Sequence, residues 1–76
     1  MLTTMAVAAD LVRDAGGDDP RHGLRAIAAL GRLLEQLERL HVDRARAGGW
    51  SWQEIAGELG VTKQTVHRKH GGRFRR

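Results

Sequence analysis

Polar side chains near the C-terminus have the types and spacing that allow specific recognition. Four of them fall on neighbouring turns of one expected helix: Lys63, Gln64, His67 and Arg68. Glutamine can pair with N6 and N7 of adenine, and lysine or arginine with O6 and N7 of guanine. These four residues are therefore candidates for contact with base edges in double-stranded DNA. For Lys63 and Arg68, contact with phosphate alone remains an alternative.

A second group of polar residues surrounds this helix and is suited to phosphate. Thr62 lies at the expected helix start, where free backbone amides and the helix dipole favour an anion. The other candidates for phosphate contact are Ser51, Gln53, Lys69, Arg73, Arg75 and Arg76. The last residues, 71–76, either order on DNA or remain a disordered terminus.

The distribution of charge points in the same direction. The net charge is +4, but residues 1–42 carry five arginines and six acidic residues. Residues 43–76 carry eight basic and three acidic residues, and no acidic residue follows Lys63. A one-sided basic segment is typical of a nucleic-acid or anionic-membrane binder, although it also occurs as a solvated face.

A helix-turn-helix is predicted to position these side chains. Ser51 and Glu54 have the spacing of a capping box, which starts a helix after Ser51. Gly60 suits a tight turn that needs positive φ, and Thr62 caps the next helix, which extends to His70. Residues of the motif core and turn are expected to be Ile55, Ala56, Leu59, Gly60, Val61 and Val66. Two such helices meet at about 90–120° in a helix-turn-helix.

Two further helices are expected before this motif, so the predicted fold class is all-α. A short helix from about Thr4 to Ala15, capped by Thr3 or Thr4, ends at Gly16-Gly17. A long helix begins with Asp19 as its N-cap and Pro20 at its first position, and it runs to about Ala47. We expect residues 1–49 and 50–76 to be two parts of one structural domain.

The long helix has a wider apolar face than a short monomer can cover. Ile27, Leu30, Leu34 and Leu37 follow a helical spacing, and Leu33 and Leu40 widen the stripe. A chain of 76 residues has only marginal stability as a monomer. We therefore expect Ile27, Leu30, Leu34 and Leu37 to form a homodimer interface. The alternative is a helical adaptor that docks on another protein through the face from Leu24 to Leu40.

The segment from Gly49 to Ala56, followed by Leu59 to Lys69, resembles small actinobacterial helix-turn-helix regulators. It is also similar to the DNA-binding end of sigma factors. The resemblance spans about residues 24–73 and implies a bacterial transcriptional regulator. Lys69 departs from the pattern, because its position is often apolar. The helix is therefore expected to end sooner or to lean on Phe74, which we interpret as a lid on the small core.

Other functional classes find little support in the sequence. No nucleophile, carboxylate pair or phosphate loop indicates an enzyme or a cofactor. Cysteine is absent and the four histidines lack zinc spacing, so no metal site is expected. No signal peptide or membrane span is evident, which predicts a soluble, cytoplasmic protein associated with the nucleoid. One of Trp50 and Trp52 is expected to close the junction with the long helix.

Overall fold

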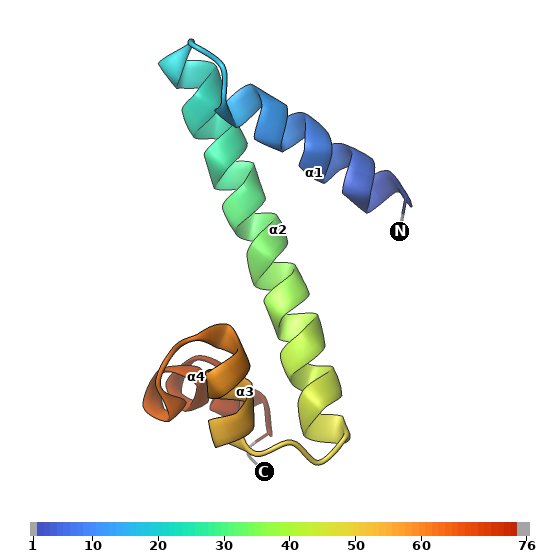
Figure 1. Cartoon of the computed structure of the whole chain (residues 1–76), viewed down its shortest axis with the longest axis vertical. Helices are drawn as coiled ribbons and strands as arrows, with labels where there is room; N and C mark the ends of the chain where they lie inside the picture. The colour runs from blue at the N-terminus through green and yellow to red at the C-terminus, as the bar shows by residue number, and fades with distance from the viewer. Residues whose placement is uncertain (1, 75–76) are drawn as a thin grey trace. The chain divides into compact units, whose positions relative to one another are not determined.

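The computed structural model describes residues 2–74 and contains helices without strands in that range. The helices are α1 (Leu2–Ala15), α2 (Pro20–Ala47), α3 (Trp52–Leu59) and α4 (Lys63–His70), followed by a 3₁₀ turn, η1 (Gly71–Phe74) (Figure 1). The predicted all-α fold class is confirmed. Arg75 and Arg76, two of the candidate phosphate contacts, lie outside the described residues.

Helix ends agree with the sequence except at the beginning of the chain. α1 begins at Leu2, so Thr3 and Thr4 lie within it and the predicted cap there is wrong. Residues 1–3 include no glycine or proline, so nothing in the sequence prevents the helix from beginning before Thr4. The start of α2 is as predicted, because the Asp19 carboxylate accepts a hydrogen bond of 3.1 Å from the Arg21 amide.

The chain divides into two compact units, residues 1–37 and 38–76, and the boundary lies inside α2. This division differs from the expected boundary after Gly49. The reason is that the last turns of α2 pack with the helix-turn-helix: Val42 belongs to the same core as α3 and α4. Sequence periodicity locates a helix, but it does not show where the partners of that helix change.

The first unit buries few of its apolar side chains. Ala26 is buried, and Gly23 is buried where its α-carbon faces the backbone carbonyls of Asp14 and Ala15. In contrast, Leu24 is 66% exposed and Leu34 is 64% exposed. Among residues 2–74, no helix combines the length and the apolar character that crossing a bilayer requires.

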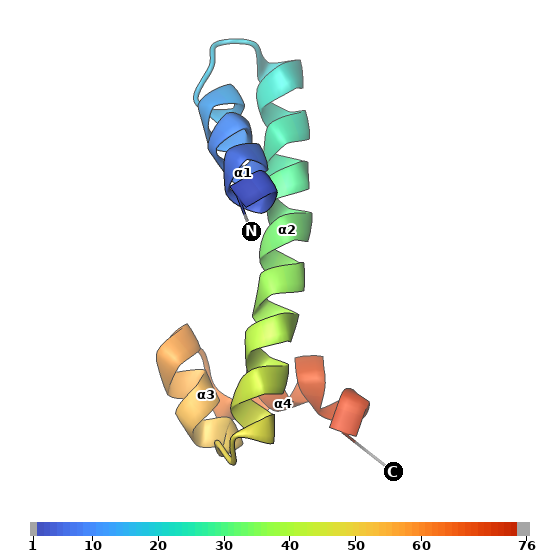
Figure 2. The ribbon, with the colours of Figure 1, turned by 90° about the vertical axis from the view of Figure 1, so that its right-hand side faces the viewer.

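The second unit contains the small core of the molecule. Val42 from α2, Ile55 and Ala56 from α3, and Val66 from α4 are all at most 4% exposed, and the half-buried Trp52 packs against them. Figure 2 shows α3 and α4 beside the last turns of α2.

Two of the residues predicted for the core lie at the surface. Leu59 and Val61 are 42% and 43% exposed, so their assignment to the motif core is wrong. They line a small surface pocket together with Lys69. The polar Lys69 occupies the position where an apolar side chain would have covered them.

Candidate nucleic-acid interface

The start of α3 is held by the predicted capping box. The Ser51 hydroxyl accepts a hydrogen bond of 3.1 Å from the Glu54 amide, and the Glu54 carboxylate accepts one of 2.9 Å from the Ser51 amide. The backbone hydrogen bond from Ser51 lowers the pKa of Glu54, and the Ser51 side chain adds to the shift. Ser51 and Gln53 are both exposed at this helix end.

The turn between α3 and α4 also follows the predicted geometry. Gly60 has φ of 72°, in the left-handed region that a side chain would strain, and its amide bonds to the Ala56 carbonyl. Thr62 then caps α4, because its hydroxyl accepts a hydrogen bond of 3.1 Å from the Thr65 amide. Local interactions therefore determine where α4 begins and which way it leaves the turn.

The candidate base-contact residues do not all have the same surroundings. Val66 and His70 form the buried side of α4. Lys63, Gln64 and Arg68 are exposed. At 100° per residue, Gln64 and Arg68 lie opposite the buried side, and Lys63 lies at the helix start. This arrangement leaves amide and guanidinium groups directed to solvent, where they can reach the edges of bases.

His67 is exposed but has contacts within the chain. Its ring meets the Trp52 ring edge-on, with 5.4 Å between centroids. The same ring lies over Gly71, where a β-carbon would come within 3.1 Å of its Nε2 atom. His67 thus borders the candidate base-contact face, and Trp52 and Gly71 restrict the positions that its ring can take.

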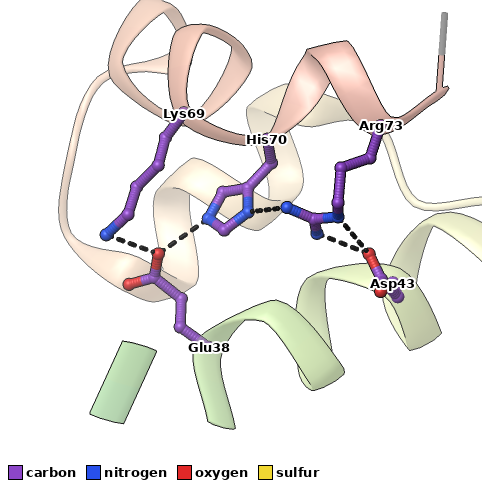
Figure 3. A network of polar contacts seen from close by, with 5 residues as sticks. All are labelled: Glu38, Asp43, Lys69, His70 and Arg73. Carbon is purple, nitrogen blue, oxygen red and sulfur yellow. Dashed lines mark hydrogen bonds and ion pairs between the residues drawn. The ribbon is translucent and has the colours of Figure 1, made fainter. Parts of the chain in front are cut away.

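Two candidate phosphate contacts form ion pairs with α2. Lys69 Nζ lies 2.9 Å from a Glu38 carboxylate oxygen, and Arg73 donates hydrogen bonds to Asp43 (Figure 3). A phosphate contact by either residue would compete with its carboxylate partner. The pair with Glu38 also explains how α4 continues to His70 with a lysine at position 69: the ammonium group meets a carboxylate.

A third cation, Arg46, has an internal position that sequence reasoning did not reveal. Its guanidinium lies 4.6 Å from the centroid of the Trp52 ring, and Nη1 donates a hydrogen bond of 2.8 Å to the Trp50 carbonyl. Phe74 is the second aromatic neighbour of this guanidinium, and its ring centroid lies 5.7 Å from that of Trp52. Trp52 closes the junction with α2, while Trp50 is 42% exposed.

Glu38 and Asp43 were not among the predicted site residues. They lie about 30 residues before their partners in the sequence. Their only sequence signal is that they are acidic residues near the end of a helix that must pack on a basic segment. Among residues 2–74, no cluster of histidine, cysteine or acidic side chains could hold a metal ion.

The pairing of Glu38 predicts a pH-dependent contribution to stability. The hydrogen bond from Lys69 lowers the pKa of Glu38 below its ordinary value of 4.5; partial burial opposes this, and the hydrogen bond from His70 adds to it. Because the folded pKa is depressed, the stabilisation is fully present above pH 4.5 and is lost as the pH falls through the folded value.

We therefore expect Glu38→Gln to destabilise the protein at pH 7 by about 1–2 kcal/mol, since hydrogen bonds to charged groups contribute about 1.5–3 kcal/mol and a glutamine carbonyl retains part of that contribution. The difference from wild type should shrink as the pH falls from 5 to 3. Urea unfolding at several pH values measures it, with Glu58→Gln, at an exposed glutamate of α3, as the control. A difference that stays constant down to pH 3 would contradict the assigned pairing.

The end of α2, α3 and α4 together form a helix-turn-helix domain, which is a DNA-binding fold. Comparison with protein families gives the same result: residues 33–70, half of the chain, match the model described as a Homeodomain-like domain. The chain belongs to the homeodomain-like domain family. A search of curated proteins found no match, and a search of solved structures also found none.

Proposed function

We propose that the protein is a transcriptional regulator that binds specific DNA sequences through α4 and has no catalytic activity. The observation that carries this proposal is the exposure of Gln64 and Arg68 on the side of α4 opposite Val66. In a helix-turn-helix, the N-terminal part of the second helix contacts base edges in the major groove. Gln64 suits adenine and Arg68 suits guanine.

Phosphate contacts are proposed for the residues around the two helix starts. Thr62, Ser51 and Gln53 lie beside free backbone amides, which favour an anion. Lys63 supplies a further positive charge at the start of α4. Since Lys69 and Arg73 pair with carboxylates, they contribute less to the dependence of binding on salt than their number suggests.

Selection of bound sequences from random duplex DNA, at a fixed and stated salt concentration, tests the function. We expect enrichment of a short motif with guanine and adenine at the positions that Arg68 and Gln64 reach. Equal retention of all duplexes, by a protein that is folded as judged by circular dichroism, would contradict sequence-specific binding.

We also propose that the protein acts as a homodimer through the α2 face formed by Ile27, Leu30, Leu34 and Leu37. Leu30 is half-buried, while Ile27 is 54% exposed and Leu34 is 64% exposed. The first unit buries little apolar surface, and a second copy of α2 would cover this face. Two recognition helices would then contact half-sites about 34–36 Å apart, or a multiple of that spacing.

A single charge on this face is expected to separate the two copies. Leu34→Asp should raise the dimer dissociation constant by at least roughly 100-fold, because an unpaired carboxylate in an apolar interface costs several kcal/mol. Analytical ultracentrifugation measures the change. Gln36→Asp adds the same charge at an exposed position on the other side of α2 and serves as the control. A wild-type protein that is monomeric at every concentration would favour the adaptor function, with the Leu24–Leu40 face binding another protein.

A further inference from the structure

We propose that His70 is a positioning residue, which orients the recognition helix on α2 through one defined tautomer of its neutral ring. This inference rests on the proposed function, because it concerns how α4 presents Gln64 and Arg68 to DNA. It assigns His70 no contact with DNA.

The ring of His70 is buried and both of its nitrogens have partners. The residue is only 3% exposed. Its Nε2 lies 2.7 Å from Oε2 of Glu38, and its Nδ1 lies 2.8 Å from Nη1 of Arg73 (Figure 3). One side of the ring thus faces α2, and the other side faces the turn that follows α4.

The chemistry of these partners determines the tautomer. A guanidinium group has donors and no acceptor, so Nδ1 must accept the hydrogen bond from Arg73. The proton of the neutral ring is therefore on Nε2, from which it is donated to the Glu38 carboxylate. A proton on Nδ1 would break the bond with Arg73. In a charged ring it would also place two positive groups side by side, and in the other neutral tautomer it would turn the Nε2 lone pair to the Glu38 carboxylate.

The network continues to a second carboxylate on α2. Arg73 donates to Asp43 through Nε, at 3.2 Å, and through Nη2. Lys69 is the second cation of this network, and its Nζ lies 2.9 Å from Oε2 of Glu38. The last turn of α4 and η1 are therefore attached to one side of α2 by polar contacts.

This attachment controls rotation of α4 because the apolar anchor is small. Within α4, the buried residues are Val66 and His70, one turn apart on the same side. One valine packed in the core allows a helix to roll around it. A second contact one turn later prevents this, and contacts with a ligand require placement within about 0.5 Å and 10–20°. The hydrogen bonds of His70 thus determine where Gln64 and Arg68 point.

Nitrogen-15 NMR of the full-length protein without DNA tests the tautomer directly. At pH 7 we expect the His70 Nδ1 signal of an unprotonated acceptor and the Nε2 signal of a protonated donor. The exposed His41 on α2 provides the control for an averaged ring. A proton on Nδ1 of His70, in a neutral or a charged ring, would overturn the proposal.

DNA binding by two variants separates positioning from packing. His70→Leu keeps a side chain of similar volume without hydrogen bonds, whereas His70→Gln keeps an amide that can donate to Glu38. We expect His70→Leu to remain folded and to lose roughly tenfold of its preference for the selected duplex over random DNA, as a misaligned base contact would. His70→Gln should retain most of the preference, and His41→Ala should retain all of it.

The failures of the two proposals can be told apart. A wild-type protein that does not discriminate between duplexes would refute the proposed function. A wild-type protein that discriminates, with a folded His70→Leu variant that discriminates equally well, would refute positioning alone. If His70→Leu does not fold, the comparison passes to Arg73→Gln, which loses the guanidinium that donates to Nδ1 of His70. Full preference in this folded variant would overturn the proposal.

Discussion

Replacement of Gln64 and Arg68 by alanine is expected to abolish most of the preference for the selected DNA sequence. Each bidentate base contact contributes about 1–3 kcal/mol of discrimination against the wrong base. Values near the middle of this range correspond to roughly a 10- to 100-fold preference for the correct base. Both side chains lie on the exposed side of α4, so their removal should leave the core intact. Binding of each single variant and of the double variant to the selected and scrambled duplexes measures the effect.

The pattern of the loss is as informative as its size. Gln64→Ala should relax preference at the adenine position, and Arg68→Ala at the guanine position, with little change in binding to scrambled DNA. The matched controls are Gln36→Ala and Arg32→Ala, which remove the same groups from exposed positions on α2. If both recognition-helix variants keep the full preference, α4 does not contact the bases.

A phosphate contact should give a different result. Lys63→Ala is expected to weaken binding to all sequences and to lower the salt dependence by about one counterion. Arg73→Ala should instead lower stability, because it leaves Asp43 without its partner and removes the donor to Nδ1 of His70. These two variants therefore separate charges that meet DNA from charges that hold the domain together.

The second large effect is on folding. Ile55→Ala is expected to destabilise the protein by about 2–5 kcal/mol, because it leaves a cavity in a core with few residues. Ile55 is 4% exposed and packs with Val42, Ala56 and Val66. A chain of this length has a total stability of roughly 4–11 kcal/mol, so the variant should lose a large part of it.

Leu59→Ala is the matched control, because it also truncates an apolar side chain of α3. With 42% of Leu59 exposed, we expect a loss of no more than about 1 kcal/mol. Urea unfolding followed by Trp52 fluorescence, in a Trp50→Phe background, monitors the second unit, whose core Trp52 contacts. Equal losses in the two variants would show that the core extends to Leu59.

Most short-range interactions were predictable from the sequence, and the structure agrees with them except for the cap expected at Thr3 or Thr4. The capping box of Ser51, the positive φ of Gly60 and the cap at Thr62 each depend on residues within three or four positions. Gly48 and Gly49 end α2 for the same kind of reason. Such contacts require no knowledge of the rest of the fold, so residue type and spacing are sufficient to locate α3, the turn and α4.

Packing across the second unit was not predictable in this way. Leu59 and Val61 fit the apolar pattern of the motif, but burial depends on a neighbouring side chain, and the nearby Lys69 leaves them exposed. The basic segment indicated charge for DNA, yet Lys69 and Arg73, which stay partly exposed, pair with Glu38 and Asp43 on α2. Charge and hydropathy are properties of a residue, whereas pairing and burial depend on segments about 30 residues apart, which only the fold brings together.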